Sequence, residues 1–178
     1  MPYPTYGVMA AARWPEAVGR AEALVSTAGH FGTATHRLIA LCALLDPWPT
    51  PELILAVAER HLPRRRNTNS RQALLTAATS MAGIYFRRYR MADTTLEAIE
   101  EPVADLRLDL VWRTDNGLLI ADEIKTGVFS WPSNSTRAQA IRQVRAGRDH
   151  FGASFHGVRV VAIRSGNEPT YFPAQEWV

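Results

Sequence analysis

The chain has 178 residues, of which 47% are hydrophobic and 21% are charged, and its formal net charge is +3. These proportions are typical of a folded globular protein and exclude a disordered one. The single cysteine, Cys42, excludes an intrachain disulfide and a site built from four cysteines, whether for zinc or for an iron–sulfur cluster. No apolar run approaches the roughly 18 residues of a membrane span and no signal peptide is recognisable, so we expect a cytoplasmic protein without a membrane partner.

The first half of the sequence reads as a helical region over residues 1–92. Apolar residues recur at helical spacing, and Thr50 followed by Pro51 is a typical helix start. Ser70 is predicted to cap the last of these helices. The predicted helices cover 15–28, about 33–45, 51–61 and about 71–91.

The second half, residues 93–178, is predicted to form a β-hairpin, a helix and further β-structure within the same single domain. Asn116-Gly117 stands between two apolar runs, which is a strong hairpin signal. The apolar run 158–163 suits a strand buried on both faces, and a helix before it would make a crossover, which predicts a mixed sheet. The predicted strands are 95–101 at an edge, 106–113, 118–125, 158–163 and one near Tyr171, with a helix over 135–150.

Charge is distributed in blocks. Residues 60–92 hold eight arginines and no acid, and residues 125–148 hold five basic residues and no acid. Between them, residues 93–123 hold nine of the 17 acids and only two arginines. An acidic centre between basic flanks suits a metal site that faces a polyanion. The alternative is that the charges lie on solvated faces and interleave in space.

Three ionisable residues interrupt the apolar runs of the hairpin. Asp109 lies in the first run, and Glu123 and Lys125 close the second. The hairpin would bring Asp109 and Glu123 onto neighbouring strands, and residues two apart share a face of a strand. Two carboxylates suit Mg²⁺ or Mn²⁺, which polarises a phosphoryl oxygen and activates water. This pattern predicts metal-dependent hydrolysis of phosphodiesters, with these three residues as the catalytic group.

Lys125 is the only lysine, since the 20 basic residues are 19 arginines and this one lysine. An ammonium is a compact charge with an adjustable pKa, whereas a guanidinium is a planar fork that stays charged. Its use here suggests a need that arginine does not meet. The competing interpretation is that Glu123 and Lys125 form an exposed ion pair on one face of a strand, with Asp109 in solvent.

The pattern Asp109 … Glu123-Ile124-Lys125-Thr126-Gly127 resembles the signature of the PD-(D/E)xK nucleases, and Thr-Gly after the lysine resembles their RecB-like branch. The stretch 32–38, with Gly32 and His36, is similar to the first motif of that branch. Gln143 falls where the branch has Q-x-x-x-Y, with Gln139 as a rival, but Gly147 stands in place of the tyrosine. The resemblance covers about residues 32–163 and implies a restriction-endonuclease-like α/β core.

The resemblance also implies a division of roles. His36, Asp109, Glu123 and the backbone carbonyl of Ile124 would hold Mg²⁺ or Mn²⁺, and Lys125 would act as base or stabilise charge. The basic segments would line the path of the nucleic acid, through Gln143, Arg142, Arg87, Arg88, Arg64, Arg65 and Arg66.

The expected activity is therefore a stand-alone DNA nuclease of repair, mobile-element processing or phage defence, without an iron–sulfur cluster. RNA is the alternative substrate, and a second copy of the chain or an accessory protein is a further partner to consider. The alternative to an enzyme is a nuclease fold that has lost catalysis and only binds nucleic acid or a protein.

Overall fold

The computed structural model describes residues 31–46, 48–62, 68–127 and 133–177. The helix predicted over 15–28 and the predicted DNA-binding residues Arg64, Arg65 and Arg66 lie outside the described residues. The remaining elements follow the predicted order of helices, hairpin, helix and strand. The fold is α/β, with a five-stranded mixed sheet between helices, which is consistent with the restriction-endonuclease-like core that the sequence predicts.

Three helices precede the sheet: α2 (Phe31–Leu45), α3 (Pro51–His61) and α4 (Thr68–Ile84). Thr50 caps α3 as predicted, because its side chain accepts a hydrogen bond from the Leu53 N–H at 3.2 Å. The prediction that Ser70 caps the next helix is wrong, since α4 begins at Thr68 and Ser70 lies within its first turn. A π-helical turn, η1 (Tyr85–Tyr89), follows α4 directly.

The sheet has the strand order β1-β2-β3-β4-β5. Its strands are β1 (Thr94–Val103), β2 (Leu106–Thr114), β3 (Leu119–Lys125), β4 (Phe155–Ala162) and β5 (Thr170–Pro173). β3 and β4 are parallel and the other pairs are antiparallel. The crossover between the parallel strands contains α5 (Asn134–Phe151), capped by Ser133 and followed by the 3₁₀ turn η2 (Gly152–Ser154). A last 3₁₀ turn, η3, covers Ala174–Glu176.

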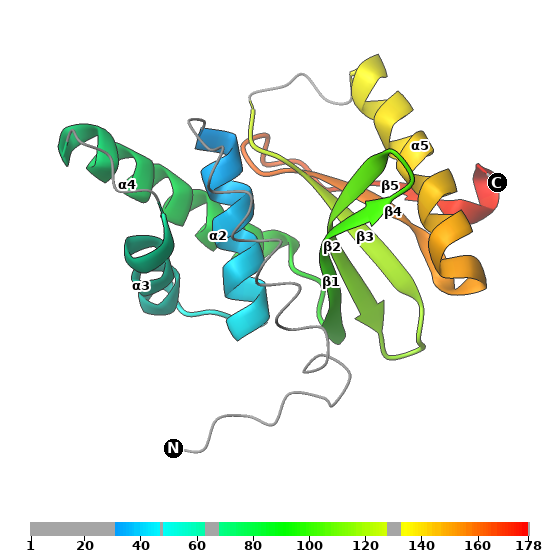
Figure 1. Ribbon diagram of the computed structural model, residues 1–178, viewed down its shortest axis with the longest axis horizontal. Helices are drawn as coiled ribbons and strands as arrows, with labels where there is room; N and C mark the ends of the chain where they lie inside the picture. Colours follow the sequence, from blue (N-terminus) through cyan, green and yellow to red (C-terminus); the bar gives the residue numbers. More distant parts are fainter. Residues whose placement is uncertain (1–30, 47, 63–67, 128–132, 178) are drawn as a thin grey trace.

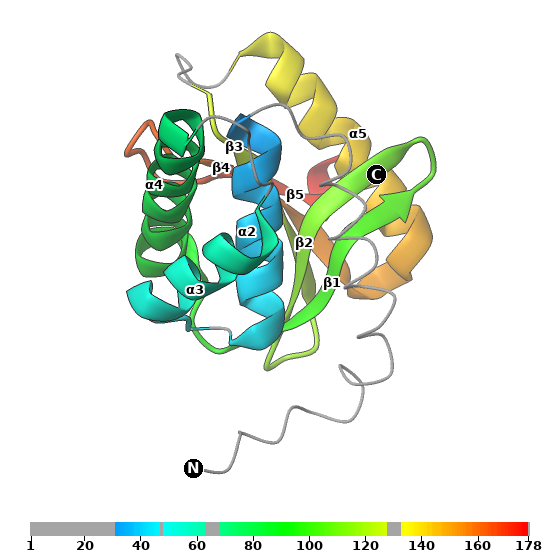
Figure 2. The same ribbon diagram turned by 60° about the vertical axis from the view of Figure 1, so that its left-hand side comes forward.

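Helices cover both faces of the sheet, which gives three layers. Helices α2, α3 and α4 pack on one face, where the core includes Ile99, Trp112 and Ile163 from the strands. Helix α5 packs on the other face against Val111 and Val158. Figures 1 and 2 show the first group of helices on one side and α5 alone on the other. None of the helices in the described part of the chain is both long and apolar enough to cross a membrane.

Candidate metal and catalytic site

Carboxylates from three adjacent strands stand in one row across the sheet. β1 and β2 pair Ile99 with Leu110 and Glu101 with Leu108, which puts Glu100 opposite Asp109. β2 and β3 pair Leu110 with Asp122, so the next step of the register puts Asp109 opposite Glu123. All three carboxylate residues are buried. Buried acids in this arrangement require compensating charge, either from side chains or from a cation.

Glu100 takes part in this row because the backbone is distorted at its position. Its φ is +46°, in the left-handed region that residues other than glycine seldom adopt. The register of β1 also shifts between Leu96 and Ala98. The Glu100 side chain is only 3% exposed, and its carboxylate forms an ion pair with Arg107 Nε. Strained backbone of this kind persists where the surrounding structure holds it, and it is frequent at functional sites.

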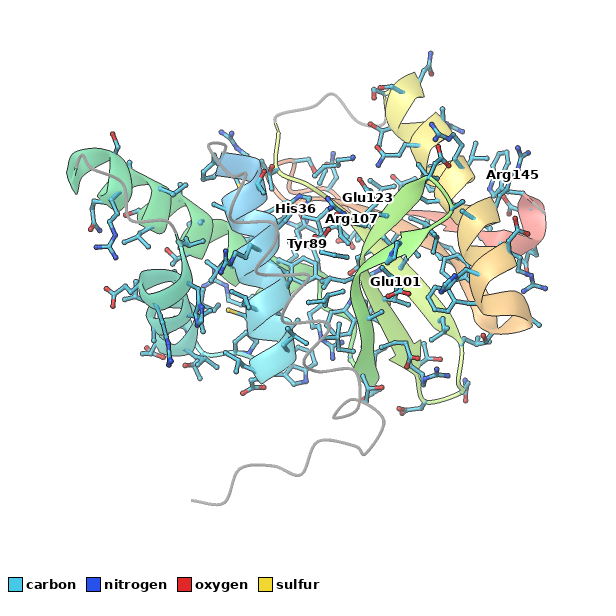
Figure 3. All side chains as sticks on the ribbon, in the orientation of Figure 1. His36, Tyr89, Glu101, Arg107, Glu123 and Arg145 are labelled. Atoms are coloured by element: carbon cyan, nitrogen blue, oxygen red, sulfur yellow. The ribbon has the colours of Figure 1, made fainter. Side chains whose placement is uncertain are left out.

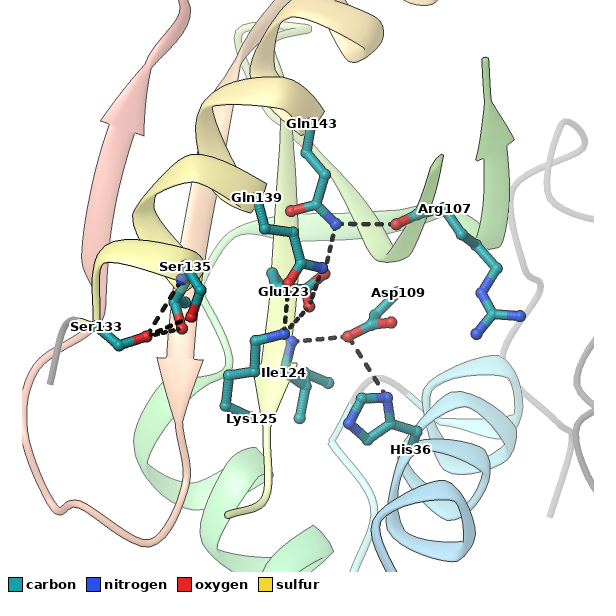
Figure 4. A network of polar contacts seen from close by, with 11 residues as sticks. His36, Arg107, Asp109, Glu123, Ile124, Lys125, Ser133, Ser135, Gln139 and Gln143 are labelled. Carbon is teal, nitrogen blue, oxygen red and sulfur yellow. Dashed lines mark hydrogen bonds and ion pairs between the residues drawn. The ribbon is translucent and has the colours of Figure 1, made fainter. Parts of the chain in front are cut away.

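His36 reaches the row from the helical layer. It lies in the second turn of α2, and its Nδ1 is 3.5 Å from Oδ2 of Asp109 (Figure 4). Helix α2 approaches the end of β3 closely, because a Cβ added to Gly32 would lie only 2.9 Å from Oγ1 of Thr126. The stretch that contains Gly32 and His36 is thus in direct contact with the Thr-Gly stretch, and His36 lies beside Asp109.

Among the described residues, the atoms best placed to hold a metal ion belong to His36, Glu100 and Asp109. One ligand atom from each lies within 4.8 Å of the other two. An imidazole with two carboxylates is a donor set for a divalent ion of the Mg²⁺ or Mn²⁺ class. The group differs from the predicted one, because Glu100 stands in the place given to Glu123. Ile124 enters through its N–H, which donates to Asp109 Oδ2 at 2.8 Å, and a role for its carbonyl stays a prediction.

Glu123 is instead held by three donors of the chain itself (Figure 4). Its Oε1 accepts from Lys125 Nζ at 2.5 Å and from Gln139 Nε2 at 2.9 Å. Its Oε2 accepts from Gln143 Nε2 at 2.5 Å. Lys125 Nζ also donates to Gln139 Oε1 at 2.9 Å, which closes the network. The competing interpretation of an exposed Glu–Lys pair does not hold, since Glu123 is buried and the Lys125 side chain is 21% exposed.

Both glutamines considered for the last motif therefore contact Glu123. Gln143 is 1% exposed and also donates to the Arg107 carbonyl at 2.9 Å, so its amide faces the site from inside and not a nucleic acid. The tyrosine missing at Gly147 has a structural explanation. A Cβ at this position would lie 2.5 Å from the ring of Phe155, so the aromatic side chain of β4 fills the space beside α5.

The ionisation of the row follows from burial and mutual repulsion. Burial, followed by the charge of Asp109, raises the pKa of Glu100 to about 7. The same two causes raise the pKa of Glu123 against the opposing charge of Lys125. Burial alone would raise the pKa of Asp109, but His36 and the Ile124 N–H hold it below its usual value. Burial lowers the pKa of His36, yet the pairing with Asp109 outweighs it and the pKa is raised.

The predicted DNA-binding arginines are scattered. Arg142 is exposed on α5 and pairs with Asp105 at 2.8 Å. Arg87 and Arg88 lie in η1, beside the far end of β4, and line a cavity with Arg164. Figure 3 shows how the labelled site residues His36 and Glu123 lie between α2 and α5, with Arg145 on the opposite side of α5.

The sequence indicated Glu100 only together with its neighbour Glu101, as an acid that could assist a second metal ion, and not as a member of the principal group with His36 and Asp109. The register could have been counted from the tight turn between Val103 and Leu106, which pair with each other. That turn contains neither glycine nor asparagine, the residues that usually signal a hairpin turn in a sequence. Ala104 takes the left-handed conformation there instead, with a φ of +53°. Without the turn, nothing in the sequence separates Glu100 from its neighbour Glu101.

Comparison with known proteins adds no family assignment. No protein-family model matches the chain, and no curated protein matches its sequence.

Proposed function

We propose that this protein is a metal-dependent nuclease that hydrolyses phosphodiester bonds in DNA. The observation that carries the proposal is the buried cluster of Glu100, Asp109 and Glu123 on three adjacent strands, with His36 and the single lysine beside it. A buried cluster of acids costs free energy unless cations compensate it, so its presence favours a role that needs a cation. The resemblance to PD-(D/E)xK nucleases rests on the same residues and supports the same reaction.

Glu100, Asp109 and His36 would hold the ion, and Glu123 would join them when a hydrogen bond to it is released. Bound there, Mg²⁺ or Mn²⁺ would polarise the phosphate and lower the pKa of a water molecule. The donor set fits this class of ion, since carboxylate oxygens and one imidazole converge from β1, β2 and α2.

Lys125 is positioned to act on the phosphate. Its ammonium has three donors, and among the described residues two of them are used, by Glu123 and Gln139. The third is left for a phosphate oxygen or for the attacking water. Gln139 holds both Glu123 and Lys125, so it fixes the distance between the acid and the base. Gln143 fixes the other carboxylate oxygen from the same helix.

The test is cleavage of plasmid and of single-stranded DNA in the presence of Mg²⁺ or Mn²⁺. Replacing Asp109 by Asn or Lys125 by Met should reduce the rate roughly 100-fold or more, because each removes a group that acts on developing charge. Asp105→Asn is the matched control, since this acid lies in the same hairpin and is 77% exposed. It should cleave like the parent protein.

Two outcomes would contradict the proposal. Absence of metal-dependent cleavage on every DNA and RNA substrate would leave the alternative of a nuclease fold that only binds. Cleavage that survives both Asp109→Asn and Lys125→Met would place the active site elsewhere.

A further inference from the structure

A cavity of about 570 Å³ lies between the end of the α4–η1 helix and the loop that follows β4. It is lined by Ile84, Arg87, Arg88, Ile163, Arg164 and Gly166. We propose that this cavity, here called the arginine pocket, binds a backbone phosphate of the DNA strand that contacts Lys125. The inference deepens the proposed nuclease function and rests on it for the identity of the polyanion.

The charge of the arginine pocket is largely uncompensated. Glu168 forms an ion pair with Arg88, but its side chain is 88% exposed and lies 3.8 Å from Nη2 of Arg88. Within the described part of the chain, neither Arg87 nor Arg164 forms an ion pair or a hydrogen bond through its guanidinium. Exposed guanidiniums that converge on a cavity form a fork that matches phosphate oxygens, which is the geometry that arginine provides and lysine does not.

One wall of the arginine pocket is already fixed. Arg88 donates a hydrogen bond to the carbonyl of Gly166, and so joins the helical layer to the loop after β4. The Arg88 guanidinium also lies 5.5 Å from the ring centre of Tyr89, which is itself buried. Arg87 and Arg164 are therefore presented from two segments that are tied together, and less ordering is needed when an anion binds.

The arginine pocket is connected to the catalytic lysine through the backbone. Lys125 pairs with Ala162 in the parallel ladder of β3 and β4, and the carbonyl of Lys125 accepts from the Ile163 N–H at 3.0 Å. Arg164 is the next residue, so its Cα is roughly 7 Å along the chain from that of Ala162. A DNA strand whose phosphate contacts Lys125 can thus reach the arginine pocket over a few nucleotides.

The experiment measures DNA binding in EDTA, where metal-dependent cleavage does not occur. The probe is a short fluorescent DNA with a duplex and a single-stranded tail, and its affinity is recorded by anisotropy over a range of salt concentrations. Arg87→Ala and Arg164→Ala should each weaken binding roughly tenfold, as loss of a charge-assisted hydrogen bond predicts. Each should also reduce the slope of log affinity against log salt by about 0.7–0.9.

Two further variants make the result specific. Arg145→Ala removes the same charge from the far side of α5, where Arg145 donates to the Trp177 carbonyl, and it should bind like the parent. Arg164→Lys keeps the charge but not the fork, so it should keep the salt slope of the parent while it binds less tightly than the parent. Arg87 and Arg164 are both exposed, so their replacement leaves the core intact.

The arginine pocket would be overturned if Arg87→Ala and Arg164→Ala left the affinity and the salt slope unchanged. It would also be overturned if they lost no more affinity than Arg145→Ala. This result is distinguishable from failure of the proposed function. If the parent protein does not cleave DNA but the two variants weaken binding as expected, the arginine pocket stands and the nuclease reaction falls.

Discussion

Adjacent residues on β3 have opposite surroundings, because side chains of a strand alternate between its faces. Glu123 faces α5 and the candidate metal site, whereas Asp122 faces the layer of helices. Asp122 accepts hydrogen bonds from the Tyr85 hydroxyl at 2.6 Å and from Trp112 Nε1 at 3.2 Å. It also accepts two from Arg159, at 2.7 and 2.8 Å. Asp122 therefore stabilises the fold by joining η1, β2 and β4, and it has no contact with the site in the described structure.

Replacing Asp122 by Ala should lower the free energy of unfolding by about 3–5 kcal/mol, because it leaves Arg159 charged and unpaired in the interior. The measurement is urea denaturation, with the midpoint and the slope compared with those of the parent. Asp105→Ala removes an acid from an exposed pair with Arg142 and should cost at most about 1 kcal/mol. Equal losses in the two variants would show that the buried network contributes nothing beyond a surface pair.

Helix α5 lies close to the sheet because small residues face β4. Gly147 contacts the ring of Phe155, and Val144 and Ala140 on the same side of the helix are buried. This close packing sets the height of Gln139 and Gln143 above Glu123. The position of one helix on the sheet thus determines the hydrogen bonds of Glu123.

Gly147→Ala should destabilise the protein by roughly 1–3 kcal/mol, since the added Cβ overlaps the Phe155 ring and α5 must move outward. It should also slow metal-dependent cleavage, because the two glutamines move with the helix. Gly83→Ala in α4 is the matched control, as its added Cβ meets no atom within 4 Å. That change should be neutral or stabilising by up to about 1 kcal/mol. The prediction fails if Gly147→Ala and Gly83→Ala unfold at the same temperature and cleave at the same rate.

At the scale of the whole molecule, the acidic row and the arginine pocket are built from different parts of the chain. The acidic row belongs to β1, β2 and β3, and the arginine pocket belongs to η1 and the loop after β4. The sheet brings them together, since β4 pairs with β3. Helix α2 supplies His36 beside Asp109, so the folding of the sheet and the ionisation of the acidic row are linked.

This linkage predicts how stability depends on pH. The pKa of Glu100 is raised from 4.5 to about 7 in the folded protein, so the folded state binds more protons than the unfolded state between these pH values. Stability should therefore fall as the pH rises from about 5 to about 7, by roughly 2–4 kcal/mol for this group. The raised pKa of His36 acts in the same direction above pH 6.5. Thermal unfolding in EDTA across this range is the measurement.

Mn²⁺ should reverse the trend, because the ion binds the deprotonated ligands and its stabilising effect grows with pH. Glu100→Gln should flatten the curve in EDTA and weaken the effect of Mn²⁺. Glu168→Gln, an exposed acid on the opposite loop, should follow the parent protein. A Glu100→Gln curve that keeps the parent's slope would mean that another group causes the pH dependence.

The local signals in the sequence predicted much of the fold. Thr50-Pro51 placed the start of α3, Asn116-Gly117 placed the turn between β2 and β3, and the apolar run 158–163 indicated the buried strand β4. These signals are short-range, so they are readable without knowledge of the tertiary structure. The start of α4 was misplaced by three residues, because Ser70 is a good cap in isolation but the chain begins the helix at Thr68.

For the candidate site, the sequence by itself determined that Asp109 and Glu123 lie on paired strands and that Glu123 and Lys125 share a face, since the pitch of a strand and one turn signal suffice. Only the tertiary structure decided that Glu100 joins Asp109 and His36, because its place depends on a strained backbone and a turn without glycine. The same holds for Gln143, whose burial follows from how closely α5 packs on β4. Contacts between distant elements depend on packing, and no local pattern encodes them.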